Sequence, residues 1–104
     1  MRRRWIVAAA FVIGVSAVPV GAQERVEEGR RAFTEQGCYG CHTVKAFGTP
    51  IGPDLSRVGA KYSETYLTKW LRDPAEQRPA AHMPKLELTD TQIAALAAFL
   101  SALR

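Results

Sequence analysis

The stretch Cys38-Tyr39-Gly40-Cys41-His42 governs how the rest of this 104-residue chain is interpreted. It holds both cysteines of the chain and the first of its two histidines, which follows the second cysteine directly. From Cys38 to Lys61 the chain is rich in Gly, Pro, Thr and Ser, with the run Gly48-Thr-Pro-Ile-Gly-Pro53 at its centre. This composition predicts a loop rather than a strand.

Helices are expected on both sides of this segment. Residues 24–36 place apolar or small side chains three to four apart, with acidic residues in the early turns, and Gly37 ends that helix. Ser63 can cap a short second helix, which Asp73-Pro74 must end. Thr89 with Gln92 forms a capping box for the last helix, whose apolar stripe consists of Ile93, Leu96, Ala97, Leu100 and Leu103. With residues 74–88 as an ordered, proline-punctuated loop, the expected fold is all-α, with three to four helices joined by long loops.

Residues 1–22 have the organisation of a secretory signal peptide. A positive start (Arg2-Arg-Arg4) precedes an apolar run from Trp5 to Val18, and small side chains at Val20 and Ala22 follow. Cleavage after Ala22 would leave residues 23–104 as the mature domain, and its expected location is the periplasm. The alternative is an uncleaved membrane anchor, because residues 5–23 are all uncharged and nearly long enough to span a bilayer. The domain would be exported in both cases.

The net charge and the length constrain what the exported domain can be. Residues 23–104 carry 11 Lys+Arg against 10 Asp+Glu, so the +4 of the whole chain does not indicate nucleic-acid binding. A domain this short, with so many loops, buries too little surface to offset its conformational entropy. Such domains are usually stabilised by disulfides, a metal or a cofactor, and a disulfide between cysteines three positions apart constrains little. A larger group is therefore expected in the core.

Cys-x-x-Cys-His is the attachment motif of c-type haem. The thiols of Cys38 and Cys41 would add to the two vinyl groups of the haem, and His42 would lie under the iron as the proximal ligand. Three alternatives compete with this interpretation. A thioredoxin-like redox motif would need a βαβ context, a zinc site would need His82 as its fourth ligand, and a structural disulfide would leave the core unfilled.

Met83 is the candidate for the sixth ligand of such an iron. It is the only methionine of residues 23–104, and it lies 41 residues beyond His42 in the segment Ala81-His-Met-Pro84. A thioether ligand favours the ferrous state more than a second imidazole does. The alternatives are that Met83 fills a gap in the core, or that His82 is the ligand.

Together these motifs resemble those of a class I cytochrome c, in the order of that family. They are Cys38–His42, Ile51-Gly-Pro-Asp-Leu55, His82-Met-Pro84 and the C-terminal amphipathic helix, and the resemblance covers residues 24–103. It implies a cytochrome c fold wrapped around one covalently attached haem. It also implies that the Pro53 carbonyl accepts the Nδ1–H of His42, which fixes the tautomer of the ring.

The resemblance implies further roles for residues that carry no motif. Gly29 and Phe33 would cross the C-terminal helix near Leu96, Phe99 and Leu100. Leu55 and Leu71 would line the haem pocket. Trp70 or Tyr62 would donate a hydrogen bond to a haem propionate, and Arg57 or Lys61 would neutralise one.

The function that follows is electron transfer without catalysis, because His42 and Met83 would occupy both faces of the iron. Asp54, Glu64 and Glu76 are interpreted as surface charges rather than as catalytic groups. Residues 45–85 carry seven basic and four acidic side chains, which suggests a positive rim for an acidic patch on a reductase or oxidase. The alternatives are a haem c subunit of a larger oxidase or dehydrogenase complex, and a gas-binding or peroxide-reducing haem protein with a labile sixth ligand.

Overall fold

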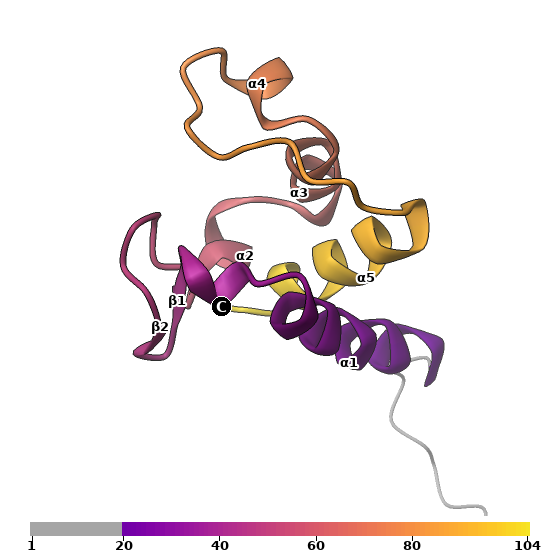
Figure 1. The fold of residues 1–104 in the computed structure, drawn as a ribbon. Coiled ribbons are helices and arrows are strands. Elements are labelled where there is room, and N and C mark those ends of the chain that lie inside the picture. Colours follow the sequence, from indigo (N-terminus) through magenta and orange to yellow (C-terminus); the bar gives the residue numbers. More distant parts are fainter. Residues whose placement is uncertain (1–19) are drawn as a thin grey trace, which may run out of the picture.

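The computed structural model describes residues 20–104, which form helices and one short hairpin (Figure 1). The elements in chain order are α1 (Val20–Glu35), η1 (Cys38–Gly40), β1 (Thr43–Val44), β2 (Phe47–Gly48), α2 (Val58–Lys61), α3 (Glu64–Arg72), α4 (Pro74–Gln77) and α5 (Asp90–Ser101). The expected all-α class is confirmed, and α2 and α4 are single turns of four residues. None of the helices within residues 20–104 has the length and apolarity needed to span a bilayer.

The first and last helices cross at the centre of the molecule, although they lie far apart in the sequence (Figure 1). Gly29 makes the crossing possible, since a Cβ atom at this position would lie only 2.6 Å from Cβ of Phe99. One turn further along α1, the ring of Phe33 meets that of Phe99 at a centroid distance of 5.5 Å. The crossing expected from the resemblance is confirmed.

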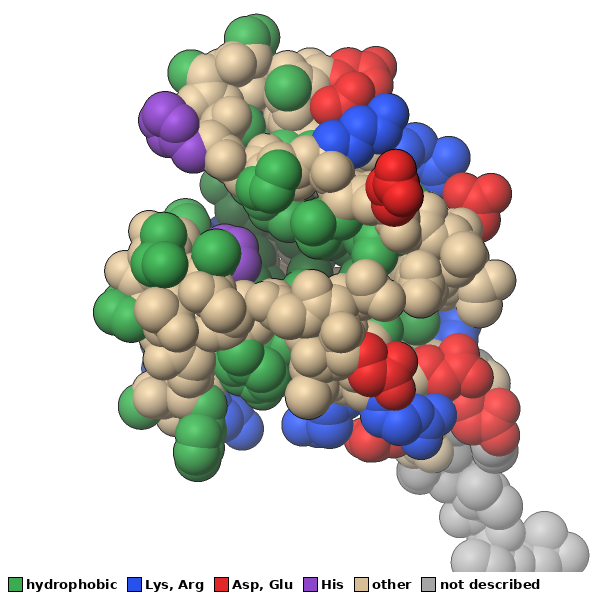
Figure 2. Space-filling model, in the orientation of Figure 1, with side chains coloured by type: hydrophobic (Ala, Val, Ile, Leu, Met, Phe, Trp, Pro, Cys, Tyr) green, Lys and Arg blue, Asp and Glu red, His purple; other side chains and the backbone are tan. Residues whose placement is uncertain are grey.

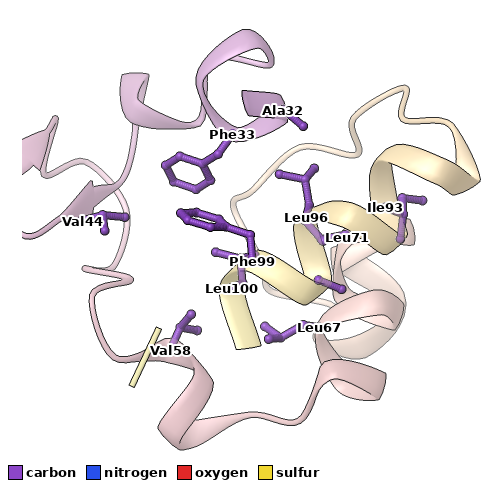
Figure 3. Close-up of a cluster of buried hydrophobic side chains, with 11 residues drawn as sticks. Ala32, Phe33, Val44, Val58, Leu67, Leu71, Ile93, Leu96, Phe99 and Leu100 are labelled. Atoms are coloured by element: carbon purple, nitrogen blue, oxygen red, sulfur yellow. The ribbon is translucent and has the colours of Figure 1, made fainter. Parts of the chain in front are cut away.

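A cluster of buried hydrophobic side chains surrounds this crossing (Figure 3). Helix α3 adds Leu67 and Leu71, so the core is continuous from α1 through α5 to α3. The remaining members are Ala32, Phe33, Val44, Val58, Ile93, Leu96, Ala97, Phe99 and Leu100. Each of these positions removes apolar surface from water, which is the main favourable contribution to folding.

The helix caps and C-terminal helix ends predicted from the sequence are confirmed. Ser63 Oγ accepts a hydrogen bond from the backbone N–H of Tyr66 at 3.1 Å, and α3 ends at the residue before Asp73-Pro74. Thr89 and Gln92 form the complete capping box of α5. Gly37 follows α1 with a φ of +75°, a left-handed conformation that glycine adopts without strain.

Helix α1 begins at Val20 rather than at residue 24, so it extends across the predicted cleavage position after Ala22. The cleavage itself stays a prediction. Most of the predicted signal peptide, and of the alternative anchor, lies in residues 1–19 and therefore outside the described residues.

The interpretation of residues 38–61 as loop was wrong in part, because they contain η1, the β1–β2 hairpin and α2. Strands β1 and β2 pair antiparallel, with Val44 opposite Phe47. The hairpin turn puts Lys45 and Ala46 at φ values of 49° and 69°, whereas Asn-Gly is the usual signal for such a turn. Helix α2 depends on a distant contact, since the N–H of Gly59 donates to the carbonyl of Leu103 at 2.7 Å. Neither the hairpin turn nor helix α2 has a recognisable pattern in the local sequence.

Candidate haem-binding site

The Cys-x-x-Cys-His motif lies on η1 and the residues that follow it. The backbone N–H groups of Cys41 and His42 both donate to the carbonyl of Cys38, at 3.2 and 2.9 Å. Cys38 is half-buried and Cys41 exposed, and no disulfide joins them. Burial raises the pKa of the Cys38 thiol above its ordinary value. The motif thus places two cysteine sulfurs and one imidazole on η1 and the two residues that follow it.

His42 is oriented by the loop that contains Pro53. Its Nδ1 lies 2.8 Å from the Pro53 carbonyl oxygen, and because that oxygen is only an acceptor, the ring proton must be on Nδ1. The lone pair of Nε2 is then available to an iron atom. This is the contact that the resemblance implies.

Two glycines that the sequence analysis did not assign allow the chain to pack around His42. A Cβ atom on Gly52 would lie 2.8 Å from Cε1 of the His42 ring. A Cβ on Gly48 would collide with the His42 carbonyl oxygen, and Gly48 also has a φ of +107°. The only sequence signal for them was the Gly/Pro-rich composition of the loop, which does not say what each glycine contacts.

Met83 lies on the segment between α4 and α5, half-buried against the hydrophobic core. The indole Nε1 of Trp70, on α3, donates a hydrogen bond to its sulfur at 3.2 Å. The resemblance implies Trp70 or Tyr62 as the donor to a haem propionate, and this role stays a prediction. Tyr62, the other proposed propionate donor, stacks on Tyr66 with ring centroids 4.7 Å apart. His82, the alternative ligand, is exposed.

The other residues proposed for the pocket divide into two groups. Leu55 is half-buried and packs against the core, and Leu71 is a buried member of it. Arg57 and Lys61 are exposed. In Figure 2 a hollow lined by hydrophobic side chains opens on the face shown, with a histidine side chain beside it. An apolar macrocycle with a ligand on each side suits such a surface.

Asp54 was interpreted as an ordinary surface charge, and this interpretation was incomplete. Its Oδ1 accepts hydrogen bonds from Thr43 Oγ1 at 3.0 Å, Ser56 Oγ at 2.8 Å and Ser56 N at 3.3 Å. These bonds, with a smaller effect of Lys61, lower the pKa of the carboxyl group below its ordinary value. The only sequence signal for Asp54 was its place in Ile51-Gly-Pro-Asp-Leu55, which does not say what its carboxylate contacts.

The donor set fits a covalently attached haem better than the alternatives. Within residues 20–104 no three His, Cys, Asp or Glu side chains converge on a point where they could bind a metal, as a zinc site would require. Cys38 begins the 3-10 helix η1 and Cys41 follows it, next to a hairpin with strands of two residues, which is not the βαβ setting of a thioredoxin-like motif. Two thiols, an imidazole with a free Nε2 and a half-buried thioether remain, and they match the donors of a haem of the c type.

The fold and this site define a small c-type cytochrome. The family model for cytochrome c matches residues 26–104, and the chain belongs to the cytochrome c family. It therefore carries a covalently attached haem c with its iron, and it is an electron-transfer protein.

The curated relatives are components of larger enzymes. The chain is 33% identical to cytochrome c oxidase subunit 2 of Alkalihalophilus pseudofirmus, with 91% of this chain and 31% of the relative aligned. It is 25% identical to a subunit of nitric oxide reductase from Halomonas halodenitrificans, over 86% of this chain and 66% of the relative. It is 31% identical to cytochrome c oxidase subunit 2 of Bacillus sp. strain PS3, over 83% and 28%. The chain thus spans less than two thirds of the length of each of them.

Proposed function

We propose that this chain is a periplasmic electron carrier that passes single electrons from a donor protein to a terminal acceptor such as an oxidase or reductase. The observation that carries the proposal is that two segments hold one iron-ligand atom each. Pro53 orients His42, and Trp70 holds the sulfur of Met83. With both residues bound, the iron would keep no position for a substrate, so we propose that the chain is not itself an enzyme.

Each residue of the site has a separate task in this proposal. Cys38 and Cys41 hold the group covalently, so that it stays in place in both redox states. His42 and Met83 would bind the iron, and their partners Pro53 and Trp70 would limit how far they move when the charge changes. When bound, the haem supplies an iron that cycles between the ferrous and ferric states.

A contact surface for a redox partner lies beside the attachment point. Cys41 is exposed, and Phe47 of β2 and Ile51, which follows β2, are 74% and 75% exposed. Large apolar side chains this exposed favour burial against another protein. The seven basic and four acidic side chains of residues 45–85 favour a partner with acidic residues around its docking site.

A second candidate is a haem c subunit that stays bound in an oxidase or nitric oxide reductase complex. It is favoured by the relatives, which are parts of such complexes and of which this chain matches only a part. Purification from native membranes and soluble extract separates the two. A carrier is recovered without stoichiometric partners, whereas a subunit is recovered with them.

The first test is the visible spectrum of the reduced holoprotein, matured in a periplasm, before and after addition of carbon monoxide. A c-type spectrum that the gas does not change supports two firm axial ligands and the carrier function. A spectrum that shifts indicates a displaceable sixth ligand and favours gas binding or peroxide reduction. Failure to attach haem would overturn the proposal.

A further inference from the structure

Two segments run side by side next to the proximal histidine, and hydrogen bonds join them at almost every residue. One is residues 41–45 and the other is residues 52–56. The N–H of Leu55 donates to the carbonyl of Thr43 at 2.8 Å, and the N–H of Lys45 donates to Ser56 Oγ at 2.7 Å. The bond from His42 to the Pro53 carbonyl belongs to the same set. The orientation of His42 therefore depends on how these two segments are held together.

Asp54 connects both segments through a single oxygen atom. Thr43 follows His42 in the chain and Asp54 follows Pro53, so the Thr43–Asp54 bond lies one residue beyond the His42–Pro53 bond. Asp54 also accepts the hydroxyl and the backbone N–H of Ser56, which closes a turn directly after it. Ser56 in turn accepts from Lys45 on the other segment. The carboxylate is thus the common acceptor of the arrangement.

An ionised carboxylate is suited to this position because it accepts several donors at once and donates none. Hydrogen bonds to a charged acceptor are also stronger than those between neutral groups. The lowered pKa of Asp54, caused mainly by the Ser56 and Thr43 hydroxyls, agrees with an acceptor that is ionised at neutral pH. Asp54 is exposed, yet the three hydrogen bonds from Thr43 and Ser56 all go to the same oxygen atom, Oδ1.

We propose that Asp54 is the positioning residue of the proximal histidine. By holding Thr43 and Ser56 it keeps the Pro53 carbonyl against the Nδ1–H of His42, and so sets the strength of His42 as an iron ligand. The inference rests on the proposed role of His42 as that ligand. A firm Nδ1–H bond makes the imidazole a better electron donor, which stabilises ferric iron more than ferrous iron. Loss of Asp54 therefore raises the reduction potential.

The test compares Asp54→Ala and Asp54→Asn with Glu76→Ala in the holoprotein. Glu76 is an exposed acid with no side-chain hydrogen bond or ion pair among those found in residues 20–104, so its variant controls for loss of an unbonded surface carboxylate, while Asp54→Asn loses the same charge at the same place as Asp54→Ala. NMR of the reduced, ¹⁵N-histidine-labelled protein measures solvent exchange of the His42 Nδ1 proton. We expect exchange to be about tenfold faster in Asp54→Ala, as for loss of hydrogen bonds to a charged group. Asp54→Asn keeps an acceptor oxygen and should fall between parent and Asp54→Ala, while Glu76→Ala should match the parent.

The reduction potential is the second measurement, since a role in loop stability alone would leave it unchanged. Exchange and potential in Asp54→Ala equal to those of Glu76→Ala would overturn the inference while leaving the proposed function intact. If Asp54→Ala does not accumulate with haem, Thr43→Val removes the bond nearest to His42, and parent-like exchange in that variant would overturn the inference instead. A parent protein without a c-type spectrum would refute the proposed function.

Discussion

Gly29 of α1 lies against the backbone of Ala95 in α5, closer than any other residue type would permit. A Cβ atom at position 29 would come within 2.7 Å of the Ala95 carbonyl carbon and 2.6 Å of Phe99 Cβ. Both obstacles belong to a buried helix that cannot move without separating the rings of Phe33 and Phe99. The central helix crossing therefore depends on the absence of a side chain at Gly29.

Gly29→Ala should destabilise the protein, although alanine is the better helix former. Forcing one methyl group into a packed contact costs about 1–3 kcal/mol, and we expect a loss in that range in chemical denaturation of the holoprotein. Glu24→Ala, on the exposed side of the same helix, serves as the control and should stay within about 0.5 kcal/mol of the parent. Equal stability of Gly29→Ala and the parent would contradict the observed crossing.

Asp54 should make stability depend on pH in the acid range. The pKa of its carboxyl is lower in the folded chain than the ordinary value of 3.8, so the ionised form favours folding. This contribution is present in full above the unfolded pKa, and it is lost as the pH falls through the folded pKa. Denaturation of parent and Asp54→Asn from pH 7 to pH 2 should show a difference that shrinks below about pH 4. A difference that is constant with pH would argue against an ionised acceptor.

Trp70→Phe should weaken the hold on Met83, because it removes the N–H that bonds to the sulfur but retains an aromatic ring. We expect added imidazole to displace Met83 from the ferric protein about tenfold more readily, the usual size of such partner effects at metal sites. Tyr66→Phe keeps the ring that stacks on Trp70 and is the matched control.

Met83→Ala should abolish the sulfur ligation altogether, and an unchanged spectrum and potential in that variant would exclude Met83 as a ligand.

Phe47→Ser and Ile51→Ser test the exposed apolar surface beside Cys41. Both side chains are largely in solvent, so thermal stability should change little. Electron transfer to the physiological protein partner should slow in both variants, while reduction by a small molecule such as ascorbate should not. Rates with the protein partner should also fall as ionic strength rises if the basic residues of 45–85 guide docking. A parent-like rate with the protein partner would place the contact surface elsewhere.

Short motifs allowed the class of the fold and most of the site to be predicted. The Cys38–His42 segment indicates its cofactor by the spacing of the reacting groups, which is a property of the local chain. The capping box of Thr89 and Gln92 and the cap at Ser63 were equally visible, because helix ends are specified by residues three positions apart. Membership of the cytochrome c family agrees with these predictions.

The errors lie where a distant contact overrides local preference. Lys45 and Ala46 adopt left-handed conformations that their residue types do not favour, and Lys45 and the preceding strand β1 are also joined to residues 54–56. The bond from the Trp70 N–H to the Met83 sulfur likewise depends on the packing of α3 against the segment after α4. Asp54 was interpreted as a surface charge like Glu64 and Glu76, since its donor Thr43 reaches it only when the chain folds back, although Ser56 is only two residues away.

The chemical groups of this protein follow from the order of its residues: two thiols and an imidazole at fixed spacing, one thioether, and the helices whose ends are capped locally. Which groups hold them in place follows only from the packed fold. The partners of His42 and Met83 lie 11 and 13 residues away. The glycines at 29, 48, 52 and 59 are needed because distant parts of the chain lie where a Cβ atom would be too close to them. Such partners follow from how the elements pack, and close packing depends on the shapes of all of them together.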